Sequence, residues 1–267
     1  MEKPAFSLAD YSLILTSSLF TSLLTITLIT RKIVRYPYPE LIIPSLVIIG
    51  AVAWFSSSKL HRPKSLARKY CLLFGIYLLL IGIPKLLLLS KPAWKLLSII
   101  ATIELTSYAP LILGMTLVLS TRFALMDWKK ILVLLLILLG SMFFLFNMLI
   151  AKTAPPFQEV RNIFDVPSIL LLHILLNILC LALSTIGSLT LPKGLLRSIM
   201  IVFQIVSFLT VFVDISFWLK RMELPVFSGK FLISLIRLIY PSISAFLPIF
   251  YYSQARKIVS KVKLQND

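Results

Sequence analysis

The chain has 267 residues, of which 59% are hydrophobic and 14% are charged, and its mean hydropathy is +0.97. Soluble domains are about 45–50% apolar and about 25% charged, so this composition excludes both a soluble globular protein and a disordered one. The net charge of +17 comes from basic residues clustered between apolar runs. Such clusters are typical of loops that meet anionic lipid headgroups, and we expect no nucleic-acid partner. The sequence therefore predicts an all-α polytopic transmembrane helical bundle.

Eight apolar segments are long enough to cross a bilayer, for which a helix needs about 20 mostly apolar residues. Taken in chain order, they make residues 1–267 a single transmembrane domain. The predicted spans are 8–30, 40–56, 70–90, 97–120, 131–151, 167–190, 198–219 and 231–253. The second span is short and contains Pro44 and Gly50, so seven spans plus one irregular segment is the alternative.

The loops predict the orientation of the chain, because cytoplasmic loops are enriched in Lys and Arg. Fifteen basic residues lie on the side of the N-terminus, and ten lie in loops on the other side. We therefore expect a multi-pass protein of the cell membrane with both termini in the cytoplasm.

The sequence contains none of the familiar catalytic motifs. It has no His-Glu-x-x-His, no Gly-x-Ser-x-Gly and no glycine-rich phosphate loop. With two histidines, His61 in a basic loop and His173 in a span, a multi-histidine metal or haem site is not available. We expect no metal and no cofactor, and an enzyme is the least favoured class of function.

A small set of polar and ionisable side chains lies inside the predicted spans, where each is costly unless it is paired or hydrated. These are Lys85, Glu104, Asn147, His173, Asp214 and Arg237. Each lies about four to seven residues from a span end on the less basic side. At about 1.5 Å per residue, they share one layer roughly 6–10 Å below that face.

Polar neighbours on the same helix faces extend this layer, among them Tyr108 near Glu104 and Asn177 near His173. Antiparallel neighbours at matched depth can pair directly, as Asp214 with Arg237 and Glu104 with Lys85. The prediction is a polar site near the external face that binds a small ligand or ion. Its predicted ligand-binding residues are Lys85, Glu104, Tyr108, Asn147, His173, Asn177, Asp214 and Arg237.

Two alternatives to a ligand site stay open at this point. The charges can form a buried salt-bridge network that only fixes the order of the helices. Alternatively, the spans end a few residues earlier, and the charged side chains extend to the lipid headgroups.

Several short motifs accompany the later spans. The basic motif Ala67-Arg68-Lys69-Tyr70 leads into the third span. Trp94-Lys95 leads into the fourth span, which contains Tyr108-Ala109-Pro110. The basic turn Asp127-Trp128-Lys129-Lys130 leads into the fifth span. In these features, over about two thirds of its length, the chain resembles the seven-helix membrane sensor region at the N-terminus of some histidine kinases and cyclases. Those sensors continue into a cytoplasmic kinase or cyclase domain, whereas this sequence ends at Asp267 after a short basic tail. The resemblance implies that any output passes through a partner protein.

Three functions fit this pattern. The leading prediction is a receptor-like, ligand-sensing membrane module without an output domain of its own. The second is a transporter or permease membrane subunit, in which the polar layer lies on the substrate path. The third is an intramembrane enzyme that uses Glu104, His173 and Asp214 as acid–base groups. The expected partners are the lipid bilayer, a small ligand or ion, and a signalling or transport protein.

Overall fold

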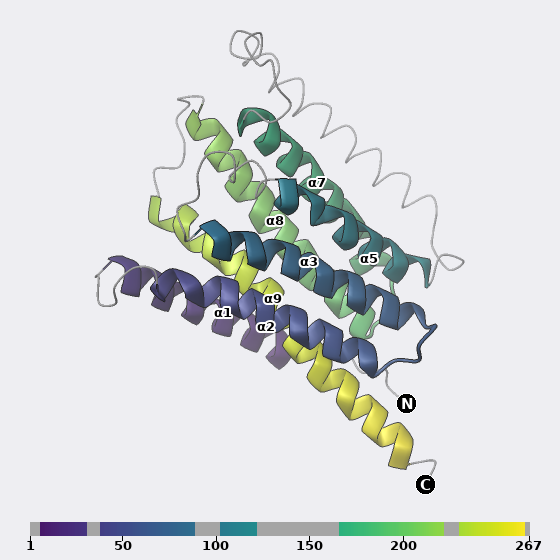
Figure 1. The fold of residues 1–267 in the computed structure, drawn as a ribbon. Coiled ribbons are helices and arrows are strands. Elements are labelled where there is room, and N and C mark those ends of the chain that lie inside the picture. The colour runs from purple at the N-terminus through teal and green to yellow at the C-terminus, as the bar shows by residue number, and fades with distance from the viewer. Residues whose placement is uncertain (1–5, 31–37, 89–101, 122–165, 222–229, 265–267) are drawn as a thin grey trace.

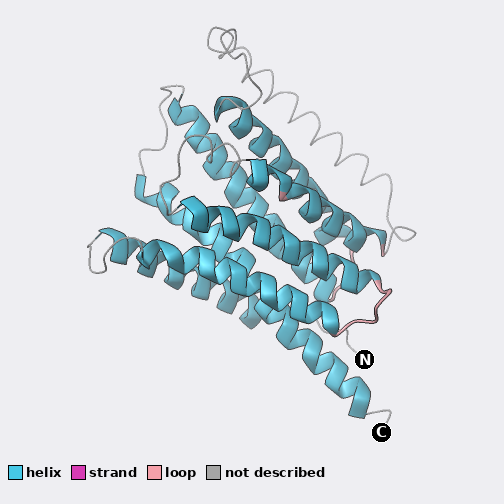
Figure 2. Cartoon of the chain, viewed as in Figure 1, coloured by secondary structure: helices cyan, strands magenta, loops and turns pink. Residues whose placement is uncertain are grey.

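The helices of the computed structural model are arranged as a bundle, and the structure describes residues 6–30, 38–88, 102–121, 166–221 and 230–264 (Figure 1). Within these ranges the chain is helical apart from short turns, and it contains no strand (Figure 2). The helices are α1 (Leu8–Thr30), α2 (Tyr38–Lys59), α3 (Leu66–Leu88), α5 (Tyr108–Ser120), α7 (Val166–Thr190), α8 (Leu195–Arg221) and α9 (Lys230–Leu264).

Seven helical segments in the described part of the chain are long and apolar enough to cross a membrane. This confirms the predicted helical bundle and a multi-pass integral membrane protein. Each predicted span has a matching segment except 131–151, which lies outside the described residues. The second span is a continuous helix of 22 residues in spite of Pro44, so it is not irregular. Helix α9 continues beyond the predicted span 231–253, to Leu264.

The helix contacts close into a ring in the order α1, α2, α3, α5, α7, α8 and α9, and α9 packs against both α1 and α2. Helices that follow one another directly in the chain are antiparallel. In contrast, α5 and α7 run parallel, because Tyr108 at the start of α5 contacts His173 near the start of α7.

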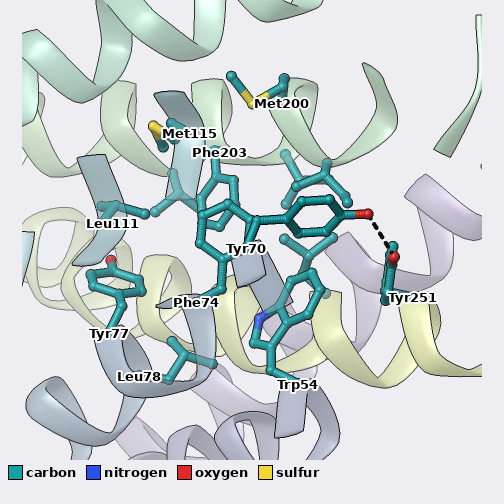
Figure 3. Packing of buried hydrophobic residues seen from close by; sticks show 14 of the residues in the cluster. Trp54, Tyr70, Phe74, Tyr77, Leu78, Leu111, Met115, Met200, Phe203 and Tyr251 are labelled. Atoms are coloured by element: carbon teal, nitrogen blue, oxygen red, sulfur yellow. Dashed lines mark hydrogen bonds between the residues drawn. The ribbon is translucent and has the colours of Figure 1, made fainter. Parts of the chain in front are cut away.

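The centre of the bundle is filled by aromatic and long apolar side chains (Figure 3). The ring centroids of Phe74 and Phe203 are 4.8 Å apart, and those of Trp54 and Phe74 are 5.3 Å apart. Met115 and Met200, from α5 and α8, are completely buried against them. In lipid there is little hydrophobic gain from helix association, so close van der Waals packing of this kind holds the helices together.

Small residues let α2 and α9 approach each other closely. A Cβ atom placed on Gly50 would lie 2.8 Å from the carbonyl oxygen of Ala245 and 2.9 Å from its Cα atom. The neighbouring side chains Ala51 and Ser242 are also small and fully buried. This contact fixes α9 against α2 and explains why a glycine stands in the middle of a membrane helix.

The fourth span begins with a helical turn that carries Glu104. A short helical segment, 102–106, ends in a turn at Ser107, and α5 follows directly. Pro110 lacks the N–H group that would bond the Thr106 carbonyl, so the regular hydrogen-bond ladder breaks at this point. The Ser107 N–H still bonds the Ile103 carbonyl, the Leu111 N–H bonds the Ser107 carbonyl, and Ser107 has helical backbone angles, so the segment that carries Glu104 continues the direction of α5.

Candidate functional site

The predicted polar side chains gather near the end of the bundle opposite the two termini. His173, Asp214 and Arg237 each lie seven residues from a helix end, at the start of α7, the end of α8 and the start of α9. At about 1.5 Å per residue, this places all three about 10 Å below those ends. Lys85 lies in the last turn of α3, which ends on the same side. We call this set, together with Glu104, Tyr108 and Asn177, the polar layer.

Tyr108 and His173 join α5 to α7 in the polar layer. The Tyr108 hydroxyl lies 3.1 Å from Nδ1 of His173, within hydrogen-bond distance. The two rings meet edge to face, with centroids 5.4 Å apart and an interplanar angle of 77°. Tyr108 is buried, whereas His173 keeps part of its surface exposed. The contact holds the imidazole at a fixed orientation with one ring nitrogen engaged.

Asn177 and Asp214 join α7 to α8 in the same layer. The Asn177 amide donates a hydrogen bond of 3.0 Å from Nδ2 to Oδ2 of Asp214. Asn177 is buried, and Asp214 is partly exposed. Since Asn177 lies one turn after His173 on α7, the His173 imidazole and the Asn177 amide lie on the same face of that helix.

The cations of the polar layer come from α3 and α9. Nζ of Lys85 lies over the Tyr240 ring, 5.2 Å from its centroid, in a cation–π arrangement. Glu104 is attracted electrostatically by Lys85 and Arg237, and Asp214 is attracted by Arg237 and repelled by Glu104. The layer therefore holds two carboxylates and two cations within electrostatic range of one another, on four different parts of the chain.

The structure thus brings together seven of the eight residues predicted to bind a ligand, while Asn147 lies outside the described residues. Their role in binding stays a prediction. Two contacts were not predicted from the sequence, the hydrogen bond from Asn177 to Asp214 and the stacking of Lys85 on Tyr240. The predicted pairing of Asp214 with Arg237 and of Glu104 with Lys85 stays a prediction. Chemically, a balanced set of carboxylates and cations suits a small solute that carries charge or several hydrogen-bonding groups.

Two tyrosines border the polar layer that the site prediction did not include. Tyr77 is buried and lies near Tyr240 and Cys180, as Tyr108 does. Tyr77 precedes Lys85 by about two turns of α3, and Tyr240 follows Arg237 by about one turn of α9. Both tyrosines could have been predicted from the sequence, because each lies a whole number of turns from a residue that was already placed in the polar layer.

A second polar cluster lies near the opposite, basic end of the bundle, and the sequence did not reveal it. The Tyr251 hydroxyl lies 3.0 Å from Nε2 of His61 and 2.9 Å from the Tyr70 hydroxyl (Figure 3 shows the Tyr70 contact). Trp54 packs on Tyr251 with ring centroids 4.8 Å apart. Burial lowers the pKa of His61 from its ordinary value. These aromatic residues lie near the basic ends of α2, α3 and α9, but only the three-dimensional ring brings them together.

No group of three His, Cys, Asp or Glu side chains that could hold a metal ion occurs among the residues that the structure describes. The carboxylates of the polar layer are accompanied by cations instead, which disfavours metal binding by charge. In comparisons with known proteins, the chain matches no protein-family model, no curated protein and no solved structure.

Proposed function

We propose that the protein is a receptor-like, ligand-sensing membrane module that binds a small polar solute or ion in the polar layer. The observation that carries the proposal is the convergence of Lys85, Glu104, His173, Asp214 and Arg237 at one level of the bundle. Ionisable groups inside membrane bundles are costly and rare, and they commonly mark ligand or ion sites. His173 and Asp214 each keep part of their surface exposed, so both side chains are open to contact with a solute.

The packing between the polar layer and the basic end favours sensing over transport. Phe74, Met115, Met200 and Phe203 fill the centre of the bundle, and each is buried (Figure 3). A polar solute in the layer would have to displace these apolar side chains to cross the bundle. The arrangement suits a solute that binds and leaves on the same side.

Helix α9 offers a route from the polar layer to the basic end. This helix carries Arg237 in the polar layer, Tyr240 beside the layer and Tyr251 in the second cluster. Its C-terminal part projects beyond the other helices (Figure 1). A ligand that changes the position of Arg237 or Tyr240 would also move the projecting part of α9. A partner protein that contacts this part would then read the change, as the resemblance to seven-helix sensor regions also suggests.

A transporter is the second candidate. Pro84 and Pro241 lie inside α3 and α9, directly beside Lys85 and Tyr240. Interior prolines remove one helix hydrogen bond each, so these positions are natural bending points next to the polar layer. Bending there could open the apolar core in a second conformation, and substrate flux would then replace signalling.

The proposal is tested with the full chain purified in a neutral detergent. Melting temperatures are measured with a panel of amino acids, small amines, organic acids and metal cations, and compared between wild type and Asp214→Asn. We expect one chemical class to stabilise the wild type, by about 2.7 kcal/mol at a concentration 100 times its Kd. The Kd for that solute should rise at least tenfold in Asp214→Asn, which lowers the stabilisation at the same concentration to about 1.4 kcal/mol or less. The Kd should be unchanged in Thr116→Ala, a control on the exposed face of α5.

Two results would count against sensing. If no solute in the panel raises the melting temperature of the wild type, the polar layer is a structural network. If a stabilising solute also crosses the membrane of protein-containing liposomes, the transporter replaces the sensor.

A further inference from the structure

We infer that the polar layer binds a small zwitterion, a solute that carries one ammonium group and one carboxylate group, as amino acids do. The inference rests on the proposed function, because it names the class of solute that the same site would take. The carboxylate of the solute would lie against Lys85 and Arg237, and its ammonium group would lie against Glu104 and Asp214.

The two cations of the polar layer lie on the side formed by α3 and α9. Nζ of Lys85, from α3, lies 5.2 Å from the centroid of the Tyr240 ring. Tyr240 follows Arg237 on α9 by three residues, which is about one helical turn. The contact with Tyr240 therefore holds the ammonium group of Lys85 about one turn from Arg237. We call Lys85 and Arg237 the cation side, and a carboxylate can accept hydrogen bonds from both kinds of side chain.

The two carboxylates of the polar layer lie on the side formed by α5, α7 and α8. Glu104 lies one turn before Tyr108 in the same run of helix, and the Tyr108 hydroxyl lies 3.1 Å from Nδ1 of His173 on α7. One turn further along α7, Asn177 donates a hydrogen bond of 3.0 Å to Asp214 on α8. Glu104 and Asp214, which we call the carboxylate side, also lie close enough to repel each other. An ammonium group placed beside them relieves that repulsion.

The two sides attract each other across the layer, and the four charges cancel. Glu104 is attracted by both cations, and Asp214 is attracted by Arg237. A solute with a single charge would leave one uncompensated charge in a partly buried site, which costs free energy because that charge has lost hydration. A zwitterion offers an opposite charge to each side and leaves the total at zero. Since the two sides interact electrostatically, its charged groups need to be only a few bonds apart.

The charged side chains of both sides are held by neutral partners and stay open to a solute. Lys85 contacts the face of the Tyr240 ring, and its ammonium group carries three N–H donors. Asn177 binds one carboxylate oxygen of Asp214, and a carboxylate has two. Each of the four charged side chains keeps part of its surface exposed in the described part of the chain. These contacts therefore fix the positions of the charges without cancelling them.

The test uses the full chain in a neutral detergent at constant ionic strength, with three sets of matched solutes. Each set holds a zwitterion, the amine that lacks its carboxylate and the acid that lacks its ammonium group. The sets are glycine with methylamine and acetate, L-alanine with ethylamine and propionate, and 4-aminobutyrate with propylamine and butyrate. The Kd of each solute is obtained from the rise in melting temperature with its concentration.

We expect at least one zwitterion to stabilise the wild type, and the Kd of its amine and of its acid to be at least about 30-fold higher. That ratio is about 2 kcal/mol at 1.4 kcal/mol per tenfold, the lower end of the loss when one partner of a charge pair is removed. Lys85→Gln should raise the Kd of the zwitterion at least tenfold without weakening the amine, which has no carboxylate. Asp214→Asn should raise the Kd of the zwitterion at least tenfold without weakening the acid. The matched control Lys64→Gln, at an exposed lysine of the α2–α3 turn, should change none of these values.

The outcomes separate this inference from the function on which it rests. An amine or an acid that binds as tightly as its zwitterion would overturn the inference and leave a ligand site in place. If none of the three zwitterions stabilises the wild type, the inference is overturned, and if no solute of any class does so, the proposed function falls with it. Equal weakening of the zwitterion and the amine in Lys85→Gln would also overturn it, because Lys85 would then not act on the carboxylate. If Lys85→Gln does not fold, Arg237→Gln takes its place with the same expectation.

Discussion

Replacing Gly50 by alanine tests the closest helix contact of the bundle. The new Cβ atom would stand 2.8 Å from the Ala245 carbonyl oxygen, and real Cβ atoms do not approach a backbone oxygen so closely. Backbone atoms cannot rotate away as the end of a side chain can, so α2 and α9 must separate. Overpacking of this kind costs about 1–3 kcal/mol. Alanine in a helix recovers about 0.5–1 kcal/mol relative to glycine. The net loss therefore lies between about 0 and 2.5 kcal/mol, and from the midpoints of the two ranges we expect about 1.3 kcal/mol.

The assay is thermal unfolding of the full chain in a neutral detergent, with Gly82→Ala as the matched control. The atoms nearest to a Cβ at Gly82 are side-chain carbons, Cγ1 of Ile48 at 3.0 Å and Cγ1 of Val47 at 3.3 Å. These side chains can adjust by a few tenths of an ångström, so Gly82→Ala should be neutral or slightly stabilising. A Gly50→Ala variant as stable as the wild type would mean that α9 does not lie against α2. The route along α9 would then lose its structural basis.

Three further predictions concern the basic end of the bundle. Tyr251→Phe removes hydrogen bonds to the buried Tyr70 and the half-buried His61 and should lower the unfolding free energy in detergent by about 1–3 kcal/mol, whereas Tyr252→Phe should change it little. Burial lowers the pKa of His61, so its contribution to stability should be complete above about pH 6.5 and lost as the pH falls through that lowered pKa. Melting temperatures of the wild type and His61→Gln measured from pH 7.5 to 4.5 should therefore converge at the acidic end, and a constant difference would contradict this. Finally, Lys64→Cys in a cysteine-free background should resist a membrane-impermeant thiol reagent added outside sealed cells, and labelling would reverse the predicted orientation.

The membrane class and the helices could be predicted from the sequence because both depend on local properties. Apolar runs of about 20 residues locate the spans, and the depth of Glu104, Asp214 and Arg237 follows from counting residues along them. The predicted eighth span ends at residue 253, whereas helix α9 continues to Leu264, and its last turns, with Arg256 and Lys257, are no longer apolar. Its true end depends on helix propensity beyond the membrane, which a hydropathy reading does not measure.

The contacts within the site could not be predicted, since they depend on the order and rotation of the helices. Nothing in the separate spans states that α5 lies beside α7, so the contact between Tyr108 and His173 was not expected. The Tyr251 cluster was missed for the same reason. Its aromatic members, Trp54, Tyr70 and Tyr251, lie on three helices and are hydrophobic enough to be read as ordinary core residues.

The most direct measurement for the polar layer is the water accessibility of its His173 position. His173→Cys is made in a background without Cys71 and Cys180, and a charged, membrane-impermeant thiol reagent is added from the side of the less basic loops. A ligand site open to that side predicts rapid modification of this cysteine, whereas the natural Cys180, two turns deeper on α7 and fully buried, should not react when it is the only cysteine present. Failure of the introduced cysteine to react, with the protein still folded, would contradict a ligand site and leave a closed network of charges.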